Sequence, residues 1–276
     1  MKAALLQLAS GDDPAANLPV TRSLVAEAVA QGAGFVLTPE VTNCRSLDRA
    51  HQRAVLRHEH EDETLAALSA DAAAHRIWLL IGSLALKTED EDGRFANRSF
   101  LIGPDGKVRA RYDKINMFDV DVSDSETYRE SSGYRPGTRA VIAPTPFGML
   151  GLTICYDLRF PQLFRRLAQA GAQILTVPAN FTATTGRAHW EVLLRARAIE
   201  NGAYVLAPAQ TGSPDPQAAR PHVSWGHALA VAPWGEVIAE AGADVGVTCA
   251  EIDLAAVDRA RRRIPSLMHD HAFEGP

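Results

Sequence analysis

Short apolar runs alternate with longer stretches of helical character along the chain, and this alternation predicts a mixture of strands and helices. Apolar runs bounded by turn residues predict strands at residues 2–8, 34–38, 78–86, 97–102, 107–113, 149–154, 174–177, 204–209, 226–232, 236–240 and 248–252. Helices are predicted at residues 17–31, 64–75, 161–170, 188–201 and 254–264. Many strands are joined by hairpin-like turns, which a purely parallel sheet does not show. We therefore expect an α/β fold, a four-layer α-β-β-α sandwich of two mixed β-sheets with outer helices.

The chain shows no internal repeat and no low-complexity linker. Its richest turn segments, residues 88–93 and 211–221, are short and lie between periodic segments, so we interpret them as loops. A single hydrophobic core can organise about 250–300 residues. We therefore expect residues 1–276 to form one domain.

Composition and charge exclude several classes of protein. Hydrophobic residues are 46% of the chain and charged residues 22%, which is typical of a globular protein and excludes a disordered one. The formal net charge is −5, so no basic excess would hold the chain on nucleic acid or on an anionic membrane. Three cysteines argue against a disulfide framework, and the apolar run at residues 2–8 is too short for a signal peptide or a membrane span. We therefore expect a cytoplasmic protein that binds neither nucleic acid nor a membrane.

A cysteine follows the apolar strand predicted at residues 149–154. Cys155 also precedes a helix that begins at Pro161. At such a strand-to-helix turn we expect the thiol to be exposed at the edge of the sheet, beside free backbone N–H groups. These groups lower the pKa of a thiol and can hold an oxyanion. The alternative interpretation is a buried structural cysteine, because free cysteines are among the most buried residues.

Two charged residues also stand at the ends of predicted strands. Glu40 follows the strand at residues 34–38, and Lys114 follows the strand at residues 107–113. Each alone is also explained as a solvated surface charge. Ligand sites in α/β proteins lie at strand ends, however, and these residues together with Cys155 supply a carboxylate base, a cation and a nucleophile.

The segments around these three residues resemble the nitrilase superfamily of carbon–nitrogen hydrolases. The similarity lies in Leu-Thr-Pro-Glu at 37–40, Tyr-Asp-Lys at 112–114 and Gly-Leu-Thr-Ile-Cys-Tyr-Asp-Leu-Arg-Phe-Pro at 151–161, and continues through residues 188–201 and 225–235. Within the superfamily the chain is similar to the branch of deaminated glutathione amidase and omega-amidase. Gln162 departs from the glutamate of many relatives, at a position that bears on helix packing.

The resemblance implies a Glu–Lys–Cys triad. Glu40 would be the general base, Lys114 would stabilise the oxyanion, and Cys155 would be the nucleophile. The backbone N–H of Tyr156 would be a second oxyanion donor. Glu130 matches the second acid of the family, although an exposed loop acid is the alternative interpretation. No cofactor and no metal ion are implied, and we expect a homodimer or a larger homo-oligomer.

Substrate-binding residues are less well defined by the sequence. Arg159 lies one helical turn after the nucleophile, where it would either bind a substrate carboxylate or pair with a nearby acid. Residues 180–186, with Asn180, Phe181 and Thr185, would line the pocket, and the alternative is an ordinary loop.

The sequence thus favours a cofactor-free thiol amidase that acts on a small carboxylated amide, most similar to deaminated glutathione amidase. One alternative is an omega-amidase acting on 2-oxoglutaramate or 2-oxosuccinamate. Others are a hydrolase of N-carbamoyl amino acids and, outside the enzymes, an inactive scaffold on the same fold.

Overall fold

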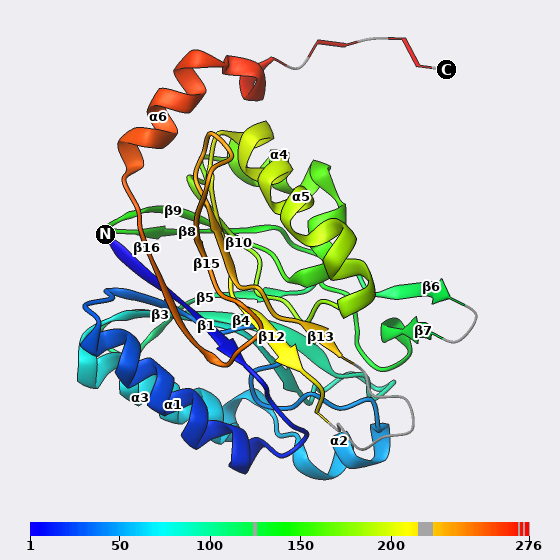
Figure 1. Ribbon diagram of the computed structural model, residues 1–276. Helices are drawn as coiled ribbons and strands as arrows, with labels where there is room; N and C mark the ends of the chain where they lie inside the picture. Colours follow the sequence, from blue (N-terminus) through cyan, green and yellow to red (C-terminus); the bar gives the residue numbers. More distant parts are fainter. Residues whose placement is uncertain (124–125, 215–222, 270, 273, 276) are drawn as a thin grey trace.

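The structure is a computed structural model, and it describes residues 1–123, 126–214, 223–269, 271–272 and 274–275. Two mixed sheets form its centre, and helices flank them (Figure 1). The prediction of a mixed α/β fold with two mixed sheets is therefore confirmed, while the number of layers stays a prediction.

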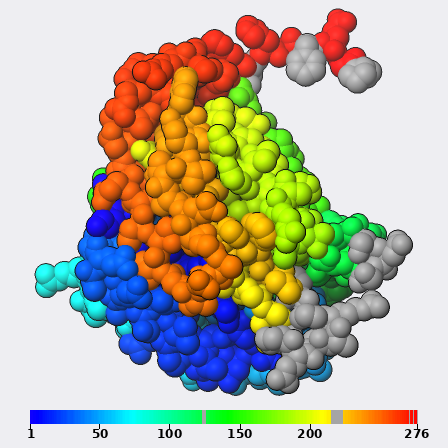
Figure 2. Space-filling view, in the orientation of Figure 1, coloured from blue at the N-terminus to red at the C-terminus, as the bar shows by residue number. Residues whose placement is uncertain are grey.

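The first sheet has eight strands, in the order β13-β12-β1-β2-β3-β4-β5, with β16 also paired to β1. β1 runs parallel to β2 and β12 but antiparallel to β16, so the first and the last strand of the sequence pair in this sheet. In the space-filling view, the orange of β16 lies against the blue N-terminal region (Figure 2). The strands are β1 (Lys2–Leu8), β2 (Phe35–Leu37), β3 (Trp78–Leu86), β4 (Ala96–Ile102), β5 (Val108–Asp113), β12 (Ala209–Gly212), β13 (Ser224–Trp225) and β16 (Gly246–Glu251).

The second sheet has six strands, in the order β15-β14-β11-β10-β9-β8. β9, β10 and β11 are parallel, and the outer pairs are antiparallel. A separate two-stranded hairpin, β6 (Asp119–Ser123) with β7 (Glu126–Arg129), lies apart from both sheets (Figure 1). The strands of the second sheet are β8 (Val141–Thr145), β9 (Gly148–Leu152), β10 (Ile174–Thr176), β11 (Tyr204–Ala207), β14 (Leu229–Val231) and β15 (Val237–Glu240).

Helices α1 and α3 pack on the first sheet, and α4 and α5 pack on the second (Figure 1). Short 3-10 turns connect other elements. The helices are α1 (Pro14–Ala30), α2 (Arg49–Val55), α3 (Glu63–His75), α4 (Pro161–Gln169), α5 (Ala183–Asn201) and α6 (Leu254–Arg263), and the 3-10 turns are η1 (Glu59–Glu61), η2 (Glu130–Ser132), η3 (Cys155–Arg159) and η4 (Pro265–Met268). No helix in the described ranges is both long enough and apolar enough to span a membrane.

Strand β1 shows how the sequence places the core. Side chains alternate between the two faces of a strand. Leu5 joins the large apolar cluster that contains Leu152 of the second sheet, whereas Leu6 joins the cluster that contains Val25 of α1 and Leu68 of α3. Because both faces of β1 are covered, its sequence is a nearly continuous apolar run.

Two element boundaries differ from the prediction and both affect the site. The strand predicted at residues 204–209 is two strands, because Pro208 ends β11 and the chain crosses to the first sheet as β12. The helix predicted to begin at residue 188 begins at Ala183, since the Thr182 hydroxyl accepts a hydrogen bond from the N–H of Thr185 and caps it. Residues 183–186 of the segment expected as a pocket loop are therefore the first turn of α5.

Other differences are smaller. Helix α1 begins at Pro14 rather than at residue 17, because the Asp13 side chain caps it. The loop at residues 88–93 is confirmed. Residues 211 and 212 end β12 instead of opening a loop, and residues 215–221 of that predicted loop lie outside the described residues. One α-helix and four strands were not predicted at all: α2, β6, β7, β8 and β13.

Candidate active site

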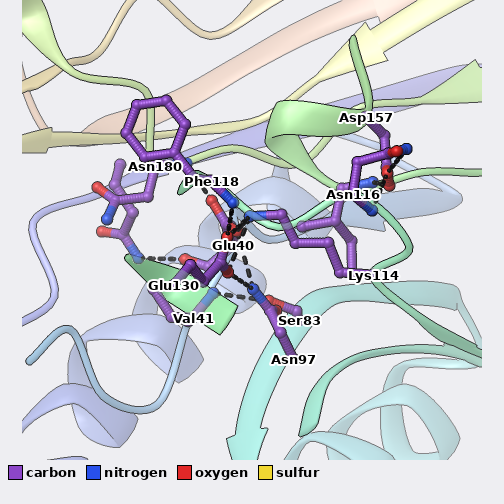
Figure 3. Close-up of polar contacts among 12 residues, drawn as sticks. Glu40, Val41, Ser83, Asn97, Lys114, Asn116, Phe118, Glu130, Asp157 and Asn180 are labelled. Carbon is purple, nitrogen blue, oxygen red and sulfur yellow. Dashed lines mark hydrogen bonds and ion pairs between the residues drawn. The ribbon is translucent and has the colours of Figure 1, made fainter. Parts of the chain in front are cut away.

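Three residues predicted from strand ends lie together where the two sheets meet. Glu40 follows β2, Lys114 follows β5, and Cys155 follows β9 and opens η3. The Lys114 Nζ atom lies 2.8 Å from Glu40 Oε1 (Figure 3). The Cys155 thiol lies beside this carboxylate, close enough for each group to shift the pKa of the other. A base, a cation and a thiol thus lie together.

A second carboxylate completes this group. Glu130 of η2 accepts hydrogen bonds from Lys114 Nζ on both oxygens, at 3.0 and 2.8 Å, and from the backbone N–H of Phe118 at 2.6 Å. The Asn97 amide donates to Glu40 at 2.9 Å and to Glu130 at 3.3 Å, so it joins the two carboxylates (Figure 3). This placement does not fit a solvated loop acid. The sequence analysis missed Asn97, whose available signal was a polar residue opening a buried strand.

The surroundings fix where the protons lie at rest. Burial alone would raise the pKa of Glu40, but the charge and hydrogen bond of Lys114 hold it below its ordinary value. Burial opposes the charge of Lys114, yet the carboxylates of Glu130 and Glu40 hold its pKa well above the ordinary value. Burial, followed by the charge of Glu40, raises the pKa of the Cys155 thiol well above its ordinary value. The resting site therefore holds a carboxylate, an ammonium and a neutral thiol.

The turn at Cys155 departs from the prediction in two ways. The residue is 7% exposed rather than open at the sheet edge, because it is part of the large apolar cluster, and its pKa is raised rather than lowered. Its φ of 47° is unusual for a residue with a side chain, and the Cys155 N–H donates to the carbonyl of Pro178 at 2.9 Å. Within the described residues, the next N–H, that of Tyr156, donates to no acceptor and remains available.

Asp157 fastens this turn to the segment that carries Lys114. The buried carboxylate accepts hydrogen bonds from the N–H of Ile154 at 2.8 Å and from the Tyr112 hydroxyl at 2.6 Å. It also accepts from the backbone and side-chain nitrogens of Asn116, at 3.0 and 2.7 Å (Figure 3). The sequence analysis gave Asp157 no role, although an acid two residues after the thiol was a signal.

The Glu40 turn is fixed by residues distant in the sequence. The Gln210 amide donates to the Glu40 carbonyl at 3.0 Å, and the N–H of Asn180 donates to Glu40 Oε2 at 2.8 Å. Strand β3 approaches closely here, because a Cβ atom at Gly82 would lie 2.0 Å from the carbonyl oxygen of Thr38. Only glycine allows this approach.

A cavity of about 740 Å³ borders the thiol. Among the described residues, no group of three or more His, Cys, Asp or Glu side chains could hold a metal ion. The predicted site residues that line the cavity are Glu40, Lys114, Glu130, Cys155, Tyr156, Asn180, Phe181 and Thr185.

Arg159 is placed differently. It is not among the described residues that line the cavity; its guanidinium lies 5.3 Å from the centre of the Phe181 ring and 3.3 Å from His189 Nδ1. Among the described residues Arg159 has no acidic partner, and its role toward a substrate carboxylate stays a prediction. The arginines that do line the cavity were not singled out from the sequence, and they are Arg45, Arg49 and Arg129.

Iodoacetamide is expected to modify Cys155 before the other cysteines, and an amide substrate is expected to slow this reaction. Cys155 borders the cavity and has Glu40 to take its proton. Cys44 also lines the cavity, but burial raises its pKa to about 12 and its thiol donates to the Asp12 carbonyl at 3.2 Å. Cys249 is not part of that lining, and burial raises its pKa as well. Peptide mapping against residual activity checks this order. Loss of activity in step with modification of Cys44 or Cys249 would contradict it.

Comparisons with known proteins give the chain's relatives. Residues 2–262 match the family model described as carbon-nitrogen hydrolase. The chain is 39% identical to the deaminated glutathione amidase of Yersinia enterocolitica, over 97% of this chain and 92% of that protein. It is 38% identical to the Homo sapiens omega-amidase NIT2, over 95% of this chain and 92% of that protein.

Solved structures have the same fold. The crystal structure of the C. elegans NitFhit protein matches with a TM-score of 0.89 and 36% identity, over 98% of this chain and 64% of that chain. A glutamate-to-glutamine mutant of the amidase from Nesterenkonia sp. AN1 matches with a TM-score of 0.78 and 26% identity, over 95% of this chain and 94% of that chain. That structure shows covalent addition of the acetamide moiety of fluoroacetamide at its active site cysteine.

Proposed function

The chain belongs to the carbon–nitrogen hydrolase family, and from this premise we propose that it is a thiol amidase that hydrolyses a small carboxylated amide through a thioester on Cys155. One observation carries the proposal. The Glu40 carboxylate forms an ion pair with the Lys114 ammonium and lies beside the Cys155 thiol at the border of the cavity. The covalent adduct on the cysteine of the Nesterenkonia amidase supports the same role for the thiol.

The first half of the reaction forms the thioester. Glu40 accepts the thiol proton, and the sulfur of Cys155 attacks the amide carbonyl carbon. Lys114 Nζ and the N–H of Tyr156 stabilise the oxyanion that forms on the carbonyl oxygen. Protonated Glu40 then donates its proton to the leaving nitrogen, the C–N bond breaks, and an amine or ammonia departs.

The second half returns the enzyme to its resting state. Glu40 takes a proton from a water molecule as the water oxygen attacks the thioester carbon. The same two donors stabilise the second oxyanion. When the C–S bond breaks, Glu40 returns the proton to the sulfur and the carboxylic acid leaves. Glu130 orients Lys114 through two hydrogen bonds, so the ammonium stays between the carboxylates throughout.

The cavity favours the larger of the two related substrates. Small-molecule sites commonly measure about 300–1,000 Å³, and this cavity of about 740 Å³ lies in the upper half of that range. Deaminated glutathione carries a Cys-Gly tail that 2-oxoglutaramate lacks, so we propose an activity like that of deaminated glutathione amidase, with omega-amidase activity as the alternative. Asn180, Phe181 and Thr185 would contact the substrate, and Arg159 stays a prediction as a carboxylate ligand.

Mass spectrometry of the intact protein tests this function. Both substrates contain the same 2-oxoglutaryl group, so a brief mix with either is expected to add that mass to the wild type and not to Cys155→Ala. We expect a higher kcat/KM for deaminated glutathione than for 2-oxoglutaramate. An N-carbamoyl amino acid as the best substrate would indicate the other hydrolase. If none of the three substrates gives an adduct or turnover, the result would favour the alternative of an inactive scaffold on the same fold.

Assembly and location belong to the same proposal. We propose a homodimer or larger homo-oligomer in the cytoplasm. The exposed apolar side chains of Val192 and Ile199 on α5, with Trp234 and Ile238 near β15, are surfaces that a second copy would cover.

A further inference from the structure

Arg45 is a buried cation for which the described residues provide no counter-ion. The residue is 4% exposed and follows Glu40 by five positions. Only Nη1 of its guanidinium is used: it donates to the Thr211 carbonyl at 3.1 Å and to the Ser224 hydroxyl at 3.0 Å. The Nε and Nη2 atoms are buried and have no hydrogen-bond partner among the described residues.

Burying a charge without an opposite charge is costly, and proteins rarely do so without a function. Burial lowers the pKa of Arg45 to about 10, so the side chain remains a cation at neutral pH. Arg129, which lines the same cavity, differs in this respect because its Nη2 atom contacts both carboxylate oxygens of Asp121, at 2.8 and 3.0 Å. Arg49, the third arginine of the cavity lining, also lacks a carboxylate partner among the described residues, but it is only partly buried and its Nη1 atom donates to the Gln52 side chain. Of the three, only Arg45 is buried without an anion among the described residues.

The unused edge of Arg45 has the geometry that binds a carboxylate. Nε and Nη2 point two N–H groups in parallel, and a carboxylate accepts both. The same protein shows the pairing: Arg22 binds Asp71 through these two nitrogens, at 2.8 and 2.7 Å. A carboxylate beside Arg45 would complete the contact that Arg22 already makes.

Arg45 also lies close to the reacting groups. The residue is among those that line the cavity, while its Nε and Nη2 atoms are shielded from solvent in this structure, so a ligand reaches that edge only when a neighbouring group moves. Its Nη1 atom bonds the Ser224 hydroxyl, which donates to the Asn180 side chain, and the N–H of Asn180 donates to Glu40. Only two residues, Ser224 and Asn180, separate the guanidinium from the proposed general base along this path. One small molecule could therefore contact both groups.

We propose that Arg45 binds a carboxylate of the substrate through Nε and Nη2 and thereby selects carboxylated amides over neutral ones. The inference rests on the proposed function, and it assigns to Arg45 the role that the sequence suggested for Arg159. The carboxylate could belong to the acyl part of the substrate or to its leaving amine. The two sources give different results with different substrates.

The test compares kcat/KM for three amides in the wild type, Arg45→Met and Arg45→Lys. 2-Oxoglutaramate carries a carboxylate only on its acyl part, deaminated glutathione carries a second on its leaving amine, and propionamide carries none. Methionine preserves much of the side-chain length without the charge, and lysine keeps the charge without the parallel N–H pair. Arg129→Met is the matched control, because that arginine lines the cavity but is already paired with Asp121.

We expect Arg45→Met to raise KM for carboxylated amides by about 10- to 100-fold, which is the range expected when a hydrogen bond to a charged group is lost. KM for propionamide should be nearly unchanged. Arg45→Lys should recover only part of this loss. A rise in KM for both carboxylated amides places the carboxylate of the acyl part at Arg45. A rise in KM for deaminated glutathione alone places the carboxylate of the leaving amine there. Equal losses for all three amides, or the same pattern in Arg129→Met, would overturn the inference.

Two further measurements separate this inference from folding and from the proposed function. The melting temperature reports the structural part of the role: Arg45→Met removes the Nη1 bonds to Thr211 and Ser224 as well as an unpaired buried charge, two effects of opposite sign. A purely structural Arg45 would give equal losses of kcat/KM for charged and neutral amides, whereas a ligand-binding Arg45 gives a loss for the carboxylated amides alone. Calorimetric titration with 2-oxoglutarate in a Cys155→Ala background measures binding without turnover. If Arg45 binds the acyl carboxylate, adding Arg45→Met to this background should weaken the affinity for 2-oxoglutarate. If the wild type hydrolyses none of the amides, the proposed function fails, while thermal stability and titration still report on Arg45.

Discussion

Cys155→Ala is expected to abolish amide hydrolysis. Loss of the nucleophile from a protease triad costs about 10⁶ in kcat, and the remaining groups here would lack any atom to form the thioester. The substitution removes one buried sulfur atom and leaves the ion pairs of Lys114 with Glu40 and Glu130 intact. We therefore expect a folded protein that still binds its substrate.

Steady-state turnover, near-ultraviolet circular dichroism and substrate titration together check this result. Because Cys155 is part of the apolar core, a loss of activity has to be separated from a loss of structure. Cys249→Ala is the matched control, since it removes a half-buried thiol remote from the cavity lining and should keep full activity. Substantial turnover in Cys155→Ala would contradict the assignment, and an unfolded variant would support the structural interpretation of the thiol.

Much of the fold was predictable because its strands are covered on both faces. The two long strands β1 and β3 coincide with their predicted ranges, since such strands are nearly uninterrupted apolar runs. The errors occur where a tertiary contact decides the structure. The hairpin β6–β7, which leads to Glu130, carries alternating exposed and half-buried residues and no strong apolar signal. Its position depends on Glu130 meeting Lys114, a contact between segments.

The site was predictable to the extent that its residues stand at strand ends. Glu40, Lys114 and Cys155 each interrupt or follow an apolar run, so their positions were visible in the pattern. The burial of the Cys155 thiol was not visible in the pattern, because it depends on how closely the two sheets pack. Arg45 gave no signal either: in a polar segment it resembles a solvated charge, and only the three-dimensional structure shows that it is buried without a counter-ion among the residues described.

Glu40→Gln and Lys114→Met are the other substitutions with large expected effects. Removal of one oxyanion donor costs about 10²–10³ in kcat, and removal of a general acid–base costs about 10²–10⁴. The acidic limb of the pH–rate profile belongs to Glu40, whose pKa lies below its ordinary value, so activity falls as protonation of the carboxylate removes the base. That limb should be absent from the residual activity of Glu40→Gln.

The triple variant with Cys155→Ala tests whether the three residues act as one unit. Without the thiol there is no proton for Glu40 to take and no thioester oxyanion for Lys114 to stabilise, so the triple variant should be hardly slower than Cys155→Ala. Lys114→Met also leaves the carboxylates of Glu40 and Glu130 without their shared cation, so we expect a lower melting temperature for it and little change for Glu40→Gln. If the losses in kcat multiply across the three positions, the residues act independently. That result would contradict the assignment of Glu40 as the base for Cys155.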